Sequence, residues 1–240
     1  MTILLKGKNC FVTGASGGLG KAIAEEFGNR GCNLFLTGRN EEKLARLKDD
    51  LKRKNPLGNY DYFSADISDI GEIETLVEKA RVALGEINIL INSAGIFPVG
   101  EIEGVSLKQY DECFNVNVKA PFILSRMFAV DMRKKNWGRI VNIGSSSSYA
   151  GYKGTAVYCS TKHAILGLGR AMYAEWKDEG VRVFTVSPGS LKTEMGRDVV
   201  GQDYDTFIKP QELAHFVADI ISYDNEMISE EIRVNRVIVQ

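Results

Sequence analysis

Apolar runs of strand length alternate with longer amphipathic segments along nearly the whole chain. The short runs are rich in Val, Ile and Leu and continuous in their apolar character, which is typical of strands that are buried on both faces. Such strands, separated by helices, predict a parallel sheet covered by helices on both sides. We therefore expect one α/β domain over residues 1–240, a doubly wound Rossmann fold with a mostly seven-stranded parallel sheet.

The expected boundaries follow from the same alternation. Strands are predicted at 9–14, 33–38, 60–66, 87–95, 138–145, 181–189 and 230–240, and helices at 18–30, 41–54, 68–84, 106–133, 157–179 and 210–222. Asp69 and Glu72 have the spacing of a capping box at the third helix. Pro121 lies inside the long fourth helix and is expected to kink or stagger it. The stretch 190–209 lacks a clear period and follows a strand, so we expect a substrate loop there.

The composition argues against several classes of function. The formal net charge is −1, so neither nucleic acid nor an anionic membrane is an expected partner. The four cysteines form no C-x-x-C pair, and His163 lies far from His215, so no metal site is predicted. The apolar stretch at the amino terminus is too short for a secretion signal, and no run reaches the length of a membrane span, which favours the cytoplasm.

A glycine-rich loop lies between the first strand and the first helix. A loop of the nucleotide-hydrolase type needs Gly six residues before Lys21 and Ser or Thr after it, but these positions hold Ala15 and Ala22. The glycines occur instead at a spacing and in a strand–loop–helix context that favour dinucleotide binding, with the pyrophosphate at the helix amino terminus. A purely structural turn is the alternative for a glycine loop taken alone. The glycines are Gly14, Gly17, Gly18 and Gly20.

The loop spacing T-G-x-x-x-G-x-G resembles that of the short-chain dehydrogenase/reductase family. Other segments resemble the family in the same order over roughly residues 5–222, and the core is similar to its 3-oxoacyl-carrier-protein reductases. The matching segments are N-S-A-G at 92–95, N-V-N-V with Asn117, I-V-N-I-G-S ending at Ser145, Y-x-x-x-K with Tyr158 and Lys162, and P-G-x-x-x-T at 188–193. The resemblance implies an oxidoreductase that uses a nicotinamide cofactor.

The predicted catalytic residues are Asn117, Ser145, Tyr158 and Lys162. Tyr158 and Lys162 are four residues apart and share one helix face, so the ammonium is expected to lower the phenol pKa and let the tyrosine exchange a proton with the substrate. Ser145 is expected to bind the substrate oxygen, with Ser146 as the alternative. The resemblance implies that Asn117 holds a water linked to the lysine; an asparagine bonded to backbone is the alternative.

The end of the second strand indicates which nicotinamide is used. An NAD site has an acid there for the ribose hydroxyls, whereas this chain has Gly38 followed by Arg39, which can pair with a 2′-phosphate. NADP(H) is therefore the expected cofactor, with a solvated Arg39 as the alternative. Guided by the family pattern, the expected cofactor-binding residues are Gly14, Ser16, Gly18, Leu19, Gly20, Arg39, Asp66, Ile67, Asn92, Ala94, Gly95, Tyr158, Lys162, Pro188, Gly189 and Thr193.

The sequence says less about the substrate. Ser147, Tyr152 and Met195 are the candidate substrate-binding residues, and Ile96, Phe97 and Tyr149 are further candidate pocket walls. Arg197 is hypothesised to meet an anionic substrate, with a solvent-exposed arginine as the alternative.

The carboxyl terminus departs from the family. Many members end the last strand with V-D-G-G, whereas this chain has Asn235 and Arg236 where glycines are expected. A homodimer or homotetramer is expected from the resemblance.

These features together predict an NADP(H)-dependent oxidoreductase that acts on a carbonyl or secondary alcohol, with tyrosine as general acid and base. Reduction is the expected direction, with 3-oxoacyl thioesters or keto-sugars as candidate substrates. A non-catalytic NADP-binding regulator on the same fold is the alternative. The complete set of catalytic residues argues against that alternative, because a protein that only binds the cofactor does not need a phenol beside an ammonium.

Overall fold

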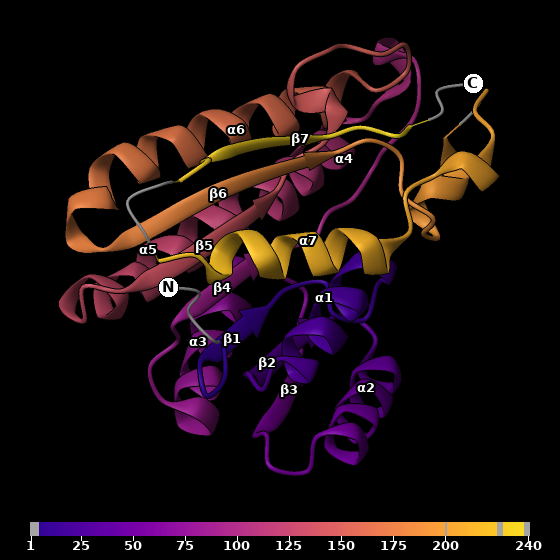
Figure 1. Ribbon diagram of the computed structural model, residues 1–240. Helices are drawn as coiled ribbons and strands as arrows, with labels where there is room; N and C mark the ends of the chain where they lie inside the picture. Colours follow the sequence, from indigo (N-terminus) through magenta and orange to yellow (C-terminus); the bar gives the residue numbers. More distant parts are fainter. Residues whose placement is uncertain (1–4, 200, 225–227, 238–240) are drawn as a thin grey trace.

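The computed structural model describes residues 5–199, 201–224 and 228–237. Seven parallel strands form one sheet in the order β3-β2-β1-β4-β5-β6-β7, which confirms the predicted doubly wound α/β fold (Figure 1). The strands are β1 (Asn9–Val12), β2 (Asn33–Gly38), β3 (Tyr60–Ser64), β4 (Ile89–Asn92), β5 (Gly138–Ile143), β6 (Val181–Pro188) and β7 (Glu231–Val234).

The strand order reverses at the middle of the sheet. Phe11 of β1 is in register with Phe35 of β2 on one side and with Leu90 of β4 on the other. The chain thus winds outward in both directions from β1 and β4. In a parallel sheet of this kind, ligands bind outside the carboxyl ends of the strands at the point of reversal.

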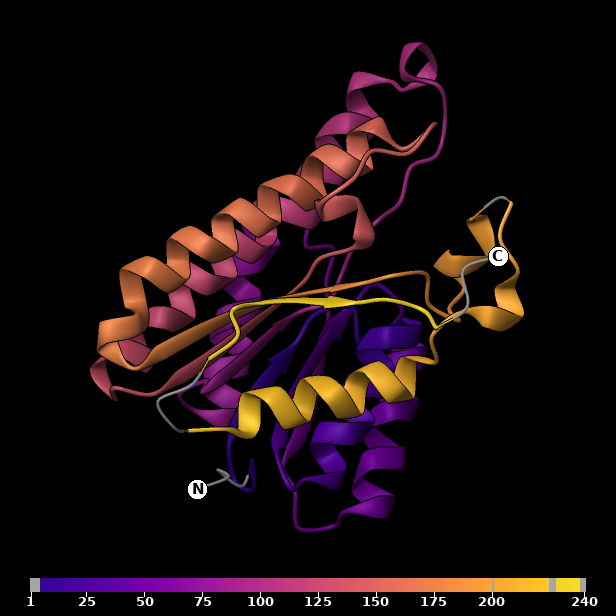
Figure 2. The ribbon, with the colours of Figure 1, turned by 45° about the horizontal axis from the view of Figure 1, so that its top comes forward.

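Helices cover both faces of the sheet, and successive residues of one strand contribute side chains to opposite faces. Val12 packs into the core beneath α1 (Gly18–Asn29), α2 (Glu41–Lys54) and α7 (Pro210–Ser222). Phe11, the residue before it, packs into the core beneath α3 (Ile70–Leu84), α5 (Ala120–Lys134) and α6 (Ala156–Trp176). Figure 2 shows the sheet between α6 and α7. This two-sided burial explains the continuous apolar runs in the sequence.

The predicted helix over 106–133 is continuous but changes its winding. It begins as α4 (Leu107–Phe114), passes through a π-helical stretch (Asn115–Lys119) and continues as α5. Ser106 and Gln109 form a capping box at its start. Pro121 lies in the first turn of α5, directly after the π-helical stretch. The stagger predicted at Pro121 is therefore a local widening of the helix, in which the Ala120 N–H bonds to the Asn115 carbonyl.

Two local predictions need correction. Asp69 caps α3 by accepting from the Gly71 N–H, but Glu72 accepts from the Asp66 N–H at 2.7 Å, so the two do not form a capping box. Glu72 instead fastens the loop between β3 and α3. The last strand ends at Val234, and 235–237 continue as irregular chain, while 238–240 lie outside the described residues. Among the described residues, no helix has the length and apolar character to cross a membrane.

Candidate active site

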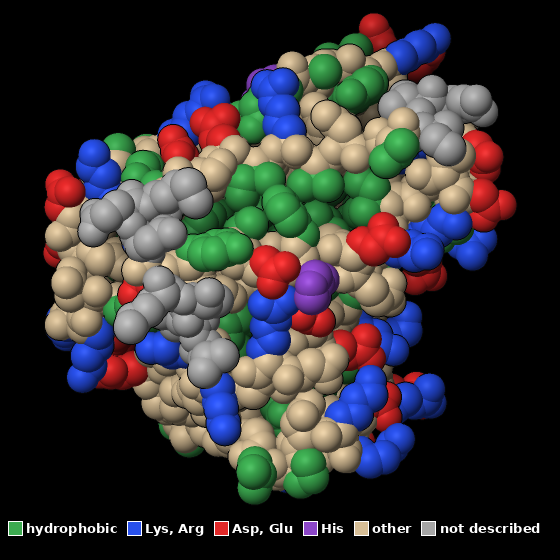
Figure 3. Space-filling model, viewed as in Figure 1, with side chains coloured by type: hydrophobic (Ala, Val, Ile, Leu, Met, Phe, Trp, Pro, Cys, Tyr) green, Lys and Arg blue, Asp and Glu red, His purple; other side chains and the backbone are tan. Residues whose placement is uncertain are grey.

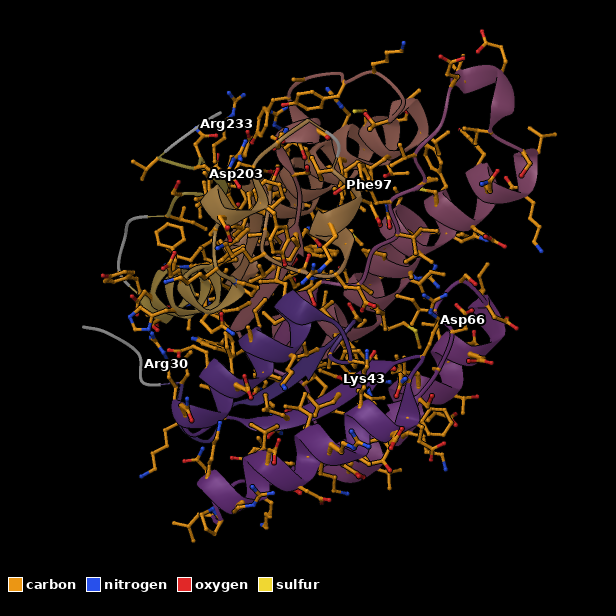
Figure 4. All side chains as sticks on the ribbon, turned by 90° about the vertical axis from the view of Figure 1, so that its right-hand side faces the viewer. Arg30, Lys43, Asp66, Phe97, Asp203 and Arg233 are labelled. Carbon is orange, nitrogen blue, oxygen red and sulfur yellow. The ribbon has the colours of Figure 1, made fainter. Side chains whose placement is uncertain are left out.

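A cavity of about 800 Å³ lies at the carboxyl ends of the strands. Its wall includes the loops that follow β1 to β6 and the chain beyond β7, so most segments that the sequence singled out meet here. Figure 4 looks at this edge of the sheet, with Asp66 of the loop after β3 and Phe97 of the loop after β4 labelled. The volume is within the range of small-molecule and cofactor sites.

The glycine-rich loop packs too closely for side chains. Gly14 has a φ of +68°, and a Cβ on it would lie 2.8 Å from the Ala94 Cα; a Cβ on Gly20 would lie 2.3 Å from the Gly14 carbonyl oxygen. A Cβ on Gly18 would lie 2.8 Å from the Thr193 Cγ2, so this glycine lets the 190–209 segment reach the start of α1. These glycines are required by close approach, as the predicted dinucleotide loop requires.

The amino terminus of α1 lines the cavity without a capping side chain. Its N-cap is Gly17, no side chain bonds to the first N–H groups, and the first turn carries no acid. Free N–H donors and the positive end of the helix dipole favour an anion such as a phosphate at this position. Thr13 supports the loop from behind, because its Oγ1 accepts from the backbone N–H groups of both Ser93 and Ala94 at 3.0 Å.

The adenosine side of the predicted cofactor site has the charge expected for a 2′-phosphate. Arg39 lines the cavity beside Asp66 and Ile67. It is exposed, and within the described chain no carboxylate lies at ion-pair distance from its guanidinium. A Cβ on Gly38 would lie 2.5 Å from the Ser16 Oγ, so a larger residue at position 38 would have to displace that serine.

Four consecutive serines follow β5 and point in different directions. Ser145 is the N-cap of the turn Ser146–Ser148, and its Oγ accepts from the Ser147 N–H at 3.1 Å. Ser148 is buried, with its Oγ accepting from the Ser145 N–H at 3.2 Å. The Ser145 hydroxyl also lies near enough to the Tyr158 phenol to lower its pKa. The structure therefore brings Ser145 to the tyrosine, as predicted, while Ser146 lines the cavity nearby.

Tyr158 lies in the first turn of α6, and its side chain is partly buried. The edge of the Phe97 ring packs against its ring with a centroid separation of 4.6 Å. Burial raises the pKa of Tyr158 to about 12, while the hydrogen bond with Ser145 acts in the opposite direction. The prediction that Lys162 holds this pKa below its ordinary value of 10 is wrong, because desolvation of the phenolate outweighs every other influence. The phenol is protonated at neutral pH.

Lys162 is buried one helical turn further along α6. Its Nζ donates to the Ile143 carbonyl at 2.8 Å and lies 5.4 Å from the centroid of the Tyr158 ring. Burial lowers the pKa of Lys162 to about 8, because the ammonium has lost most of its water. The lysine amine is thus poised to change its charge just above neutral pH, beside the phenol.

Asn117 lies behind the cavity wall. Its Oδ1 accepts from the Ile96 N–H at 2.9 Å, and its Nδ2 donates to the Ile96 carbonyl at 3.0 Å and to the Thr161 Oγ1 at 3.1 Å. The side chain therefore clamps the backbone that follows β4 against α6. This geometry matches the alternative weighed for Asn117, an asparagine bonded to backbone, although the backbone belongs to another segment of the chain.

Three further predicted residues do not line the cavity. Asn92 is buried at the end of β4, where its Nδ2 donates to the Asn142 Oδ1 at 2.9 Å. Tyr149 points toward β7, where its hydroxyl donates to Glu231 at 3.2 Å. Arg197 stacks over Tyr204 at 4.9 Å and is absent from the wall, so the hypothesis that it meets an anionic substrate is not supported by its position.

The other predicted residues line the cavity together, although their roles stay predictions. Of the substrate candidates, Ser147 is buried, whereas Tyr152 and Met195 are partly exposed at the wall. The cavity-lining cofactor candidates are Gly14, Ser16, Gly18, Leu19, Gly20, Arg39, Asp66, Ile67, Ala94, Gly95, Tyr158, Lys162, Pro188, Gly189 and Thr193.

Comparison with known proteins places this arrangement in a family. The sequence matches the short chain dehydrogenase family over residues 8–203. The chain belongs to this family. The 3-oxoacyl-[acyl-carrier-protein] reductase of Rickettsia conorii is 32% identical over 96% of both chains. An uncharacterized oxidoreductase of Thermotoga maritima is 35% identical, over 79% of this chain and 74% of the relative.

A solved structure supports the same assignment. A metagenomic short-chain oxidoreductase in complex with NADP superposes with a TM-score of 0.84 and 28% identity, and covers 97% of this chain and 99% of that chain. The protein is thus an oxidoreductase of the short-chain dehydrogenase family, and the likeness to this complex supports a nicotinamide cofactor.

Within this short-chain dehydrogenase, the structure adds residues that sequence reasoning did not assign to the site. Thr13 belongs to the glycine-loop motif, and its hydroxyl fastens two loops, which the motif could have suggested. Asn235 and Arg236 appear in the sequence only as departures from the family ending, but both line the cavity. No periodicity indicates this, because the contact depends on how the chain turns after β7.

Proposed function

We propose that this protein is an NADP(H)-dependent carbonyl reductase in which Tyr158 is the general acid. The observation that carries the proposal is the arrangement at the cavity wall, where the Tyr158 phenol lies between the Ser145 hydroxyl and the buried Lys162 amine, whose Nζ is 5.4 Å from the phenol ring centroid. A phenol with a pKa of about 12 is an acid at neutral pH, which suits protonation of a developing alkoxide. The reverse reaction would require a phenolate that burial disfavours.

The chain's own residues divide the work of reduction. Ser145 is placed to hydrogen-bond the carbonyl oxygen of the substrate and to stabilise the negative charge that grows there. Tyr158 then donates its proton to that oxygen. Lys162 is buried beside Tyr158, and its protonated amine stabilises the negative charge that remains on the phenol oxygen after the proton has left. The bound nicotinamide supplies the hydride.

NADP(H) rather than NAD(H) is the proposed cofactor. The uncapped amino terminus of α1 offers N–H donors to the pyrophosphate, and Arg39 offers a guanidinium without a carboxylate partner among the described residues to a 2′-phosphate. The NADP complex of the metagenomic relative supports this choice. A non-catalytic regulator is less consistent with the site, because burying an amine beside a phenol is costly.

Candidate substrates are 3-oxoacyl thioesters and keto-sugars. The resemblance to the Rickettsia conorii reductase over almost the full length supports the first class. The cavity of about 800 Å³ is large enough for substrates beyond simple aldehydes.

A homodimer or homotetramer is also proposed. The strand β7 is the last of the sheet, and such an edge is usually covered by a partner or protected. Figure 3 shows hydrophobic side chains gathered on the face that carries α6, β7 and α7, and the partly exposed hydrophobic residues of this region include Phe216 and Tyr223. Light scattering of the purified protein measures the assembly directly.

The experiment that tests the function is NADPH consumption against a panel of carbonyls, with NADH beside it. Tyr158→Phe is the decisive variant, since it keeps the ring and removes the proton. We expect turnover by the unaltered protein and loss of about 10³-fold or more in the variant, with NADPH affinity nearly unchanged. A variant that reduces the substrate as fast as the unaltered protein would refute the mechanism.

A further inference from the structure

The chain beyond β7 turns into the cavity instead of leaving the protein surface. Val234 pairs with Pro188 at the end of β6, and its carbonyl accepts from the Gly189 N–H at 2.8 Å. Asn235 and Arg236 follow directly and line the cavity. Figures 1 and 2 show this chain running from β7 toward the 195–208 segment.

Contacts with Thr206 and Phe207 hold the Arg236 side chain in place, beside Gly189. Its Cγ lies 3.7 Å from the position that a Cβ on Gly189 would take, and its Nη1 donates to the Thr206 Oγ1 at 3.0 Å. The guanidinium carbon lies 5.0 Å from the ring centroid of the buried Phe207. One N–H of the guanidinium is engaged in this way, and the planar group is ordered before any ligand arrives.

Among the cations of the described wall, Arg236 has neither a carboxylate partner nor a role in the proposed reaction or in cofactor binding. Lys153 pairs with Glu101 at 3.8 Å, and Lys162 donates to a backbone carbonyl beside Tyr158. Throughout 5–199, 201–224 and 228–237, no carboxylate lies within 4.0 Å of the Arg236 guanidinium, although Glu194 and Asp198 also belong to the wall.

The order of the strands brings Arg236 close enough to the proposed catalytic centre for one small substrate to reach both. Ser145 follows β5, and Arg236 follows β7, with only β6 between these strands. Two strand spacings separate the carboxyl ends of β5 and β7 by about 10 Å. The long arginine side chain shortens the gap, so a molecule with its carbonyl at Ser145 needs only a few further carbons to reach the guanidinium.

We propose that Arg236 binds an anionic group of the carbonyl substrate, a carboxylate or a phosphate, at the end of the cavity opposite Arg39. Both groups present oxygen pairs that match the N–H fork of a guanidinium. Asn235 adds a neutral polar side chain to the same wall. This proposal rests on the proposed reductase function and narrows its substrates to those that carry negative charge a few carbons from the carbonyl.

The test compares matched pairs of carbonyls with NADPH. One pair is 4-oxopentanoate and its methyl ester, and the other is dihydroxyacetone phosphate and dihydroxyacetone. The variants are Arg236→Gln and Arg236→Lys, and the control is Arg233→Gln, which removes an arginine of β7 that stacks over Tyr149 outside the cavity (Figure 4). NADPH affinity is measured for each variant.

The unaltered protein and the control should prefer one anionic member over its neutral counterpart. Arg236→Gln should lower kcat/KM for that anion by about 10- to 100-fold, mainly through KM, and leave the neutral member and NADPH affinity unchanged. Arg236→Lys should restore part of the loss. The pair that responds distinguishes carboxylate from phosphate.

A separate binding measurement keeps this inference distinct from the proposed function. Calorimetry with NADP⁺-loaded protein measures the affinity of succinate and of inorganic phosphate, neither of which is reduced. Equal affinity in the unaltered protein and Arg236→Gln overturns the role of Arg236, even if neutral carbonyls are reduced. A loss of NADPH affinity in Arg236→Gln also overturns it, by assigning the arginine to the cofactor. Absence of any carbonyl turnover overturns the reductase function, and the anion affinities still decide the inference.

Discussion

Both polar atoms of the Asn117 side chain bond to the backbone of Ile96, the Oδ1 to its N–H at 2.9 Å and the Nδ2 to its carbonyl at 3.0 Å. The asparagine comes from the π-helical stretch between α4 and α5, and Ile96 follows β4 at the cavity wall. The widened helix therefore presents a side chain that fixes the wall, which is a common use of such a stretch at functional sites.

Asn117→Leu should destabilise the protein and slow turnover together. It leaves the partly buried N–H and carbonyl of Ile96 without their side-chain partners, which costs about 2–4 kcal/mol in the free energy of unfolding. Urea denaturation and kcat measure the two effects. If the asparagine acted only through a water linked to Lys162, kcat would fall while the free energy of unfolding stayed nearly unchanged.

The rate of reduction should fall as the pH rises above about 8. Lys162 has a pKa lowered to about 8 by burial, and Tyr158 has a pKa raised to about 12. Below pH 8 the amine is charged and supports the proton-donating phenol; above it the amine is neutral, although the phenol keeps its proton. Profiles of kcat/KM between pH 6 and 10 measure this decline. Alcohol oxidation, which needs the phenolate, should instead rise over the same range.

Lys162→Met provides the matching control. It keeps an unbranched side chain without a titrating group, so its slower reduction should show no decline near pH 8. A decline at the same pH in this variant would assign the titration to another group.

Burial of Lys162 should also make the stability of the folded protein depend on pH. The amine has a lower pKa in the folded protein than in the unfolded chain, so the folded state disfavours its proton. Stability is therefore expected to increase as the pH rises through the window from about 8 toward the ordinary lysine value of 10.5, and Lys162→Met should flatten that part of the curve. Thermal midpoints measured across this window, with reversible unfolding confirmed, would test this.

The fold and most of the cavity wall were predictable because they follow from local patterns. The apolar runs set the strands, and the glycine loop and the Y-x-x-x-K pair each depend on near neighbours in the sequence. Desolvation was not predictable in this way: the one-turn spacing of Tyr158 and Lys162 predicts an attractive charge effect, whereas the phenol pKa is dominated by burial among segments distant in sequence.

Long-range polar contacts are the other part that the sequence could not supply. Arg139 occurs in an ordinary apolar strand, but its guanidinium is fully buried and donates to the Ile221 carbonyl and to Asp224 at 2.7 Å. It thereby ties the end of α7 to the sheet. Asn117 and Arg236 are similar cases, since their partners lie 21 and 30 residues away in the sequence. Such pairings depend on how loops and chain ends return to the sheet.

Arg39→Gln should weaken NADPH without weakening NADH. The loss of a charged contact to the 2′-phosphate is expected to cost about 10- to 100-fold in NADPH affinity. Fluorescence titration with both cofactors measures the ratio. Arg46→Gln is a suitable control, because Arg46 pairs with Glu42 on the exposed face of α2 and is not part of the cavity wall. Equal affinity for NADPH in Arg39→Gln and the unaltered protein would leave the solvated-arginine interpretation standing.

Two glycine-to-alanine changes should shift stability in opposite directions. In Gly20→Ala the new Cβ would lie 2.3 Å from the Gly14 backbone oxygen, and the loop must move, so we expect a loss of about 2 kcal/mol or more and weaker cofactor binding. In Gly167→Ala the Cβ meets nothing within 4 Å on an exposed position of α6, so we expect a gain of about 0.5–1 kcal/mol from helix propensity. Urea denaturation of both variants measures the difference. If Gly20→Ala unfolds like the unaltered protein and binds NADPH as tightly, then close packing does not explain the glycine at this position.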